Sequence, residues 1–122
     1  MKNLISIIEI PVTDFSRAVQ FYQTILGVDI EEVHMEGTQM GILPNDGETV
    51  NVVLVKGEDS IPTTDGPVLY LNAGDSVQAM LDKVEQNGGQ VLLPKTEISQ
   101  EMGYLALFLD LEGNKLGLHA TQ

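Results

Sequence analysis

The chain of 122 residues contains no cysteine and no tryptophan, and aromatic residues make up only 5% of it. The absence of cysteine excludes disulfides, thiolate metal sites and cysteine nucleophiles. It also agrees with the reducing cytoplasm in which we expect the protein to lie. The shortage of aromatic side chains leaves little surface for stacking on a large planar drug.

Basic residues are also scarce. The chain has six lysines and arginines against eighteen acidic residues, so its formal net charge is −12. Such a field repels polyanions, so we expect neither nucleic acid nor an anionic membrane surface as a partner. The general interpretation of this charge is solubility. The more specific interpretation, attraction of a cationic ligand, stays open.

Long apolar runs are missing too, since no stretch approaches the roughly 18–20 residues that span a bilayer. The beginning, MKNLISIIEIPV, leads directly into Pro11 and a helix start without a small-residue cleavage site. We therefore interpret it as a core strand and not as a signal peptide. The length fits one domain with its own core.

Two segments of the chain resemble each other at an offset of 61 residues, which aligns Asp14 with Asp75 and Gly27 with Gly88. Each copy begins with an apolar strand, continues with a capping residue and a helix, and ends at glycine before the next strand. Three short strands with glycine-containing turns are expected after each helix, at 30–35, 38–43, 50–55, 90–93, 104–109 and 115–119. The sequence therefore predicts an α+β fold of two βαβββ modules.

The aperiodic segment 56–66, with Pro62, is the expected connection between the modules. We expect one domain over 1–122, with the first module at about 1–56, a linker at about 57–66 and the second module at about 67–122.

Three segments together resemble the vicinal-oxygen-chelate superfamily of glyoxalases, extradiol dioxygenases, and fosfomycin- and bleomycin-resistance proteins. They are EIPVTDFSRAVQFYQTILGV, NGGQVLLPKT and GYLALFLDLEGNKLGLH, and they cover nearly the whole chain. The resemblance implies a curved mixed sheet around a cleft, usually in a homodimer. It does not imply one reaction, because this fold carries several chemistries.

The resemblance also implies four positions for the ligands of a divalent metal, on the first and last strand of each module. In this chain those positions hold Ile7, Asn51, Val68 and Gly117. Three of these side chains have no donor atom, and a single amide is a weak ligand. We therefore expect no metal and no other cofactor.

Strand alternation predicts which side chains face the cleft, because residues two apart share one face of a strand. If Ile8, Ile10, Leu116 and Leu118 pack on the helices, the other face points into the cleft. The same reasoning places Leu105, Leu107 and Leu109 toward the helices. The side chains then expected in the cleft are Ile7, Glu9, Asn51, Val53, Val68, Tyr70, Asn72, Tyr104, Ala106, Phe108, Gly117 and His119.

Glu9, Tyr70 and His119 are the main candidates for chemistry, because each follows a lost ligand position by two residues. We expect them on three adjacent strands, with Glu9 as a catalytic base and His119 as an acid. Tyr70, Asn51 and Asn72 would orient a substrate, beside an aromatic wall of Tyr104 and Phe108. A polar pair that only stabilises the sheet, and a cation held by Glu9 and His119 in a shifted position, stay open as alternatives.

Two functions follow from this hypothesis. One is a small lyase or isomerase that acts on a small organic molecule by acid–base chemistry without the metal of its relatives. The other is a non-catalytic binder of the bleomycin-resistance type, which sequesters a small compound; the acidic net charge would favour a cationic one. The sequence leaves open whether the protein is an enzyme at all.

Overall fold

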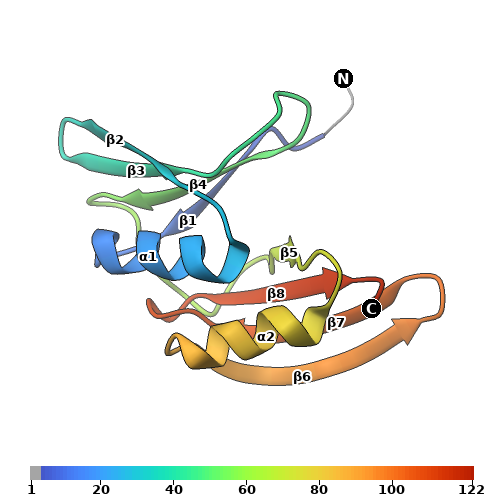
Figure 1. The fold of residues 1–122 in the computed structure, drawn as a ribbon. Coiled ribbons are helices and arrows are strands. Elements are labelled where there is room, and N and C mark those ends of the chain that lie inside the picture. Colours follow the sequence, from blue (N-terminus) through green and yellow to red (C-terminus); the bar gives the residue numbers. More distant parts are fainter. Residues whose placement is uncertain (1–3) are drawn as a thin grey trace.

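A computed structural model describes residues 4–122; the first three residues of the predicted N-terminal strand segment lie outside this range. The first module has the predicted order of elements (Figure 1). Its elements are β1 (Ile7–Pro11), α1 (Phe15–Leu26), β2 (Glu31–Met35), β3 (Thr38–Ile42) and β4 (Asn51–Lys56). They form a four-stranded sheet in the order β1-β4-β3-β2, with β1 parallel to β4.

The second module repeats this arrangement after a connection without helix or strand. Its elements are β5 (Tyr70–Asn72), α2 (Val77–Gln86), β6 (Gln90–Ser99), β7 (Gly103–Leu109) and β8 (Lys115–Ala120). The sheet order is β5-β8-β7-β6, so each module pairs its first strand with its own last strand. Two βαβββ modules in an α+β fold are therefore confirmed.

Strand β6 is longer than predicted, because it continues past Leu93 and Pro94 to Ser99. Proline removes a ladder donor and is tolerated at a sheet edge. β6 is the outermost strand, and its pairing with β7 shifts register between Leu93 and Thr96. The proline therefore interrupts the ladder without ending the strand.

Local capping explains where the helices begin and end. Asp14 accepts a hydrogen bond from the backbone N–H of Arg17, and Ser76 accepts one from that of Ala79. Gly27 ends α1 with φ of 66°, a left-handed conformation that favours glycine. None of the helices within residues 4–122 is both long and apolar enough to cross a membrane.

Both helices and both sheets contribute to one continuous core. Ile10 and Leu54 are buried on one face of the first sheet. Phe21 and Tyr22 of α1 are also buried and point toward the second module. The ring centroids of Phe21 and Phe108 lie 6.5 Å apart, which brings α1 onto β7. Figure 1 shows α1 between the first sheet and the second module, while α2 lies against the second sheet. The opposite faces of the sheets therefore point away from this core.

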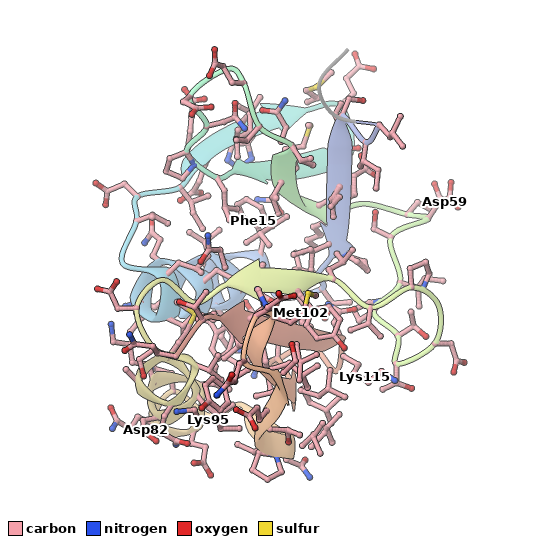
Figure 2. All side chains as sticks on the ribbon, turned by 90° about the vertical axis from the view of Figure 1, so that its right-hand side faces the viewer. Phe15, Asp59, Asp82, Lys95, Met102 and Lys115 are labelled. Carbon is pink, nitrogen blue, oxygen red and sulfur yellow. The ribbon has the colours of Figure 1, made fainter. Side chains whose placement is uncertain are left out.

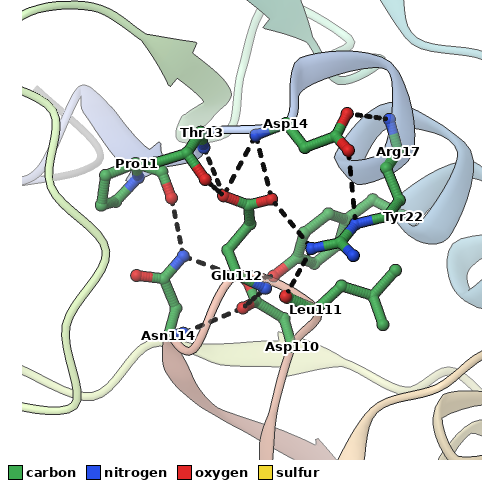
Figure 3. Close-up of polar contacts among 9 residues, drawn as sticks. All are labelled: Pro11, Thr13, Asp14, Arg17, Tyr22, Asp110, Leu111, Glu112 and Asn114. Carbon is green, nitrogen blue, oxygen red and sulfur yellow. Dashed lines mark hydrogen bonds and ion pairs between the residues drawn. The ribbon is translucent and has the colours of Figure 1, made fainter.

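A loop of the second module holds the start of α1 (Figure 3). The side chain of Glu112 is only 1% exposed, and it forms an ion pair with Arg17 at 3.6 Å. Its carboxylate accepts hydrogen bonds from the backbone N–H and the hydroxyl of Thr13 and from the backbone N–H of Asp14. Burial alone would raise the pKa of Glu112, but these hydrogen bonds and Arg17 together lower it below its ordinary value.

The same loop contains a buried polar network beneath Glu112. The Tyr22 hydroxyl donates to Asp110 Oδ2 at 2.7 Å, and the Asn114 amide donates to the same oxygen and to the Pro11 carbonyl. Burial, followed by the charge of Asp110, raises the pKa of Tyr22 well above its ordinary value. The D-L-E-G-N turn that carries part of the family resemblance thus joins the two modules.

Candidate functional site

A hollow with a volume of about 680 Å³ lies on the outer face of the second sheet. We call it the Tyr70 hollow. Its lining residues are Tyr70, Asn72, Gly74, Ile98, Met102, Leu105, His119, Ala120 and Thr121. All of them belong to the second module, and none carries a carboxylate, an ammonium or a guanidinium group. Figure 2 faces the side on which Met102 projects, where the two modules lie one above the other.

Strand register brings the polar members of this hollow together. In the parallel pair β5–β8, Tyr70 lies beside Gly117 and Asn72 beside His119. In the antiparallel pair β7–β8, Leu105 lies opposite His119. Directly paired residues point to the same face of a sheet, so these side chains share the hollow. Tyr70, Asn72 and His119 line this hollow, and Gly117 lies on the same face of the sheet beneath Tyr70; their role in binding stays a prediction.

The ring of Tyr70 lies directly over Gly117. A Cβ atom added to Gly117 would lie 2.3 Å from Cδ2 and 2.4 Å from Cε2 of Tyr70. No side chain fits between the ring and the backbone, which explains the glycine. Tyr70 nevertheless remains 47% exposed. One side of the ring is therefore supported by β8 while the rest is accessible.

His119 connects the hollow to the turn between β6 and β7. Its Nε2 lies 2.6 Å from the Met102 carbonyl oxygen. Because a carbonyl only accepts hydrogen bonds, Nε2 must carry a proton, and Nδ1 of the neutral ring is then an acceptor. The Ser99 hydroxyl accepts a hydrogen bond from the Met102 backbone N–H, which fixes the same turn.

Asn72 supplies a complementary donor. Its Oδ1 accepts a hydrogen bond from the Gly74 backbone N–H at 2.8 Å. Within residues 4–122 its amide nitrogen has no hydrogen-bond partner. The Tyr70 hollow thus combines an apolar wall with one amide donor and one imidazole ring on adjacent strands.

The expected grouping of Glu9 with Tyr70 and His119 is wrong. Glu9 lies at the junction of the modules, in a separate hollow of about 240 Å³ that also contains Asp65 and Lys115. β1 pairs with β4 in the first sheet, whereas β5 pairs with β8 in the second, so the three residues do not lie on adjacent hydrogen-bonded strands. Strand alternation predicted the face of Glu9 but could not predict this separation.

The orientation predicted for β7 is also wrong. Ala106 and Phe108 are fully buried in the core, and Tyr104 packs against it, with Lys95 Nζ 4.3 Å from its ring centroid. Leu105 instead lines the hollow, opposite His119. The strand is apolar on both faces, so alternation gave no direction. The register with β8 would have indicated which face of β7 is buried, because Ala106 is paired with the buried Leu118.

The donor set at the superfamily's metal positions does not fit a divalent cation. Asn51 is exposed on the first sheet beside Ile7, outside the Tyr70 hollow, and Tyr70 covers Gly117. Within residues 4–122, no three His, Asp or Glu side chains are placed to share a metal ion. Ile7, Val68 and Gly117 offer no side-chain donor, and a cofactor-free protein remains a prediction.

Part of the apolar wall of the Tyr70 hollow was not predicted from the sequence. Ile98 lies on the part of β6 that extends beyond Pro94, so its strand was not predicted. Met102 is one of five methionines in the chain, and methionine commonly fills gaps in a core. A hydrophobic residue next to a predicted turn would not by itself have indicated a binding surface.

Comparison with known proteins agrees with the fold. The family model described as Glyoxalase/Bleomycin resistance protein/Dioxygenase superfamily matches residues 4–118. A Glyoxylase-like domain-containing protein from Didymella fabae is 28% identical over 120 residues, which cover 90% of this chain and 88% of that protein.

Two solved structures from Streptomyces sp. CB03234 are similar over nearly their whole length. TnmS3, an antibiotic binding protein, has a TM-score of 0.72 and 25% identity, covering 96% of this chain and 94% of that chain. A glyoxalase/bleomycin resistance protein has a TM-score of 0.72 and 26% identity, covering 95% and 99%.

Proposed function

This chain belongs to the Glyoxalase/Bleomycin resistance protein/Dioxygenase superfamily, and from that premise we propose that it binds a small, largely apolar organic molecule in the Tyr70 hollow without transforming it. The observation that carries the proposal is the hollow itself. Its volume of about 680 Å³ lies within the range of ligand pockets, and apolar walls with few polar groups are their usual lining. The similarity to an antibiotic binding protein supports the same class of function.

The separation of Glu9 from His119 favours binding over catalysis. A lyase or isomerase that moves a proton from carbon needs a base and usually an acid within hydrogen-bond reach of the substrate. His119 is the one imidazole in the hollow, and its Nε2 is engaged by Met102. Glu9 lines a different hollow. The acid–base pair predicted from the sequence therefore does not support a catalytic function.

Nuclear magnetic resonance of ¹⁵N-labelled protein tests the binding function. We expect small neutral organic molecules to shift the backbone resonances of Leu105, Met102 and His119. Glu9→Gln serves as the control variant and should bind like the wild type, because Glu9 lies outside this hollow. Shifts confined to the Glu9 hollow, or none with any compound, would contradict the proposal.

We also propose that two copies associate through their outer sheet faces. Large apolar side chains are exposed there, including Ile7 at 60% and Met102 at 56%. Large apolar side chains that are exposed on a folded protein are often buried by association. Light scattering after size exclusion should show a dimer, and Ile7→Glu should shift it toward monomer. A wild-type monomer at all concentrations up to about 1 mM, a concentration at which even weak complexes form, would refute this association.

A further inference from the structure

The Tyr70 hollow contains a rigid aromatic surface that the proposed function does not by itself require. Gly117 lets the Tyr70 ring lie on the backbone of β8, and the ring keeps 47% of the side chain exposed. A ring held in this way loses little conformational freedom when a second ring stacks on it. Stacking on an aromatic side chain favours flat, conjugated ligands over saturated ones of equal size.

The charges around the hollow select against ions. None of its lining residues is Asp, Glu, Lys or Arg, so neither a carboxylate nor an ammonium ligand would find a permanently charged partner of opposite sign. The formal net charge of −12 further disfavours anions. A neutral molecule avoids both costs.

The polar groups of the hollow determine which hydrogen-bonding groups the ligand should carry. Within the described part of the chain the Asn72 amide nitrogen has no hydrogen-bond partner, and in a neutral ring His119 Nδ1 is an acceptor because Nε2 donates to the Met102 carbonyl oxygen. Asn72 and His119 are direct neighbours on β5 and β8, and adjacent strands lie about 4.8 Å apart. A ligand with an acceptor next to a donor would satisfy both groups.

We propose that the Tyr70 hollow recognises neutral, planar, conjugated molecules that carry a hydrogen-bond donor beside an acceptor, with Tyr70 as the stacking surface. This inference rests on the proposed binding function and names its ligand class. Tyr70, Asn72 and His119 determine specificity, whereas Ile98, Met102 and Leu105 supply the apolar wall. Flat lactams and hydroxy ketones belong to this class.

The test uses 2-quinolone, a neutral flat lactam, and octahydro-2-quinolone, its saturated analogue, in calorimetric titrations. We expect 2-quinolone to bind more tightly than the saturated lactam. Tyr70→Ala should weaken 2-quinolone binding about tenfold, in the range found for stacked bases, and Tyr70→Phe should retain it. The saturated lactam should change much less in either variant.

Two further comparisons test the polar edge and the charge. N-methyl-2-quinolone, which lacks the N–H donor, and quinoline-2-carboxylate, which is anionic, should both bind more weakly than 2-quinolone. Asn72→Ala should weaken both lactams. Leu92→Ala removes a comparably exposed apolar side chain of β6 outside the hollow and should change neither affinity.

The outcomes separate this inference from the proposed function. Equal binding of flat and saturated lactams at the hollow, or unchanged binding by Tyr70→Ala, would overturn the inference and leave the binding function intact. Loss of dimer in Tyr70→Ala with unchanged quinolone affinity would assign the ring to association between copies and would also overturn it. Failure of every probe to shift resonances of the hollow would overturn both.

Discussion

The carboxylate of Glu112, in the second module, accepts hydrogen bonds from both the backbone N–H and the hydroxyl of Thr13, at the start of α1 in the first. The carboxylate thus occupies the position that attracts anions at a helix N-terminus. Charge-assisted hydrogen bonds of this kind are stronger than neutral ones. The contact connects residues 99 positions apart in the chain and fixes how the modules meet.

Replacement of Glu112 by glutamine should destabilise the protein. The amide keeps the shape but loses the charge that Arg17 and the helix start compensate. We expect a loss of about 1–3 kcal/mol in the free energy of unfolding, the usual range for hydrogen bonds to charged groups. Denaturant titration measures it, with Glu101→Gln in the exposed β6–β7 turn as the matched control. Equal stability of the two variants would show that the Glu112 contact contributes nothing.

Acid should remove the same contribution in the wild type. The pKa of Glu112 in the folded protein lies below its ordinary value of 4.5. Its stabilisation is therefore complete above the unfolded pKa and is lost as the pH falls through the folded pKa. The difference in unfolding free energy between wild type and Glu112→Gln should shrink below about pH 4.5. A difference that stays constant from pH 7 to pH 3 would contradict this pKa assignment.

Tyr22→Phe should be destabilising at neutral pH, because the Tyr22 hydroxyl donates to the buried Asp110. Loss of one donor to a buried carboxylate costs about 1–3 kcal/mol. Tyr104→Phe is the control, since within residues 4–122 its hydroxyl makes no hydrogen bond. In thermal unfolding, the midpoint temperature of Tyr22→Phe should be well below that of this control. Similar midpoints would argue against the hydrogen bond from Tyr22 to Asp110.

The wild type should also lose stability at alkaline pH through Tyr22. The pKa of Tyr22 is raised in the folded protein, so its contribution is complete below the ordinary value of 10.0 and falls as the pH rises through the folded pKa. Tyr22→Phe lacks this ionisation, and its unfolding free energy should decline less steeply above pH 10. Parallel decline of both proteins would disprove the role of Tyr22.

A double-mutant cycle tests the contact of Tyr70 with Gly117 without any ligand. Gly117→Ala should cost about 1–3 kcal/mol in the wild type, because the new methyl group overlaps the ring. In a Tyr70→Ala background the same change should cost much less, since the ring atoms are gone. Chemical unfolding of the four proteins gives the coupling energy. Strictly additive effects would mean that the ring does not lie over Gly117 in solution.

The sequence predicted the parts of the fold that depend on local patterns. The repeated order of capping residue, helix and glycine predicted both modules, and the alternation of Leu116, Leu118 and His119 gave the correct faces of β8. For β7 the method failed because Leu105, Ala106 and Phe108 are all apolar. Only pairing with β8 decides which of them is buried.

The position of Glu9 could not be predicted for a different reason. Alternation within a strand indicates a face of its own sheet, but the relation between two sheets depends on contacts distant in sequence. Here the shared core and the contacts of Asp110, Glu112 and Asn114 determine that relation. The single conspicuous acid of β1 was therefore assigned to the wrong hollow.

The loop around Glu112 also makes the two βαβββ units unequal, although they share one order of strands and helix. α2 is capped by Ser76 within its own half, whereas α1 has both its own cap, Asp14, and hydrogen bonds to Glu112 of the other half. Without the second unit, the start of α1 would lose its hydrogen bonds to Glu112, whereas the cap of α2 would not depend on the first unit.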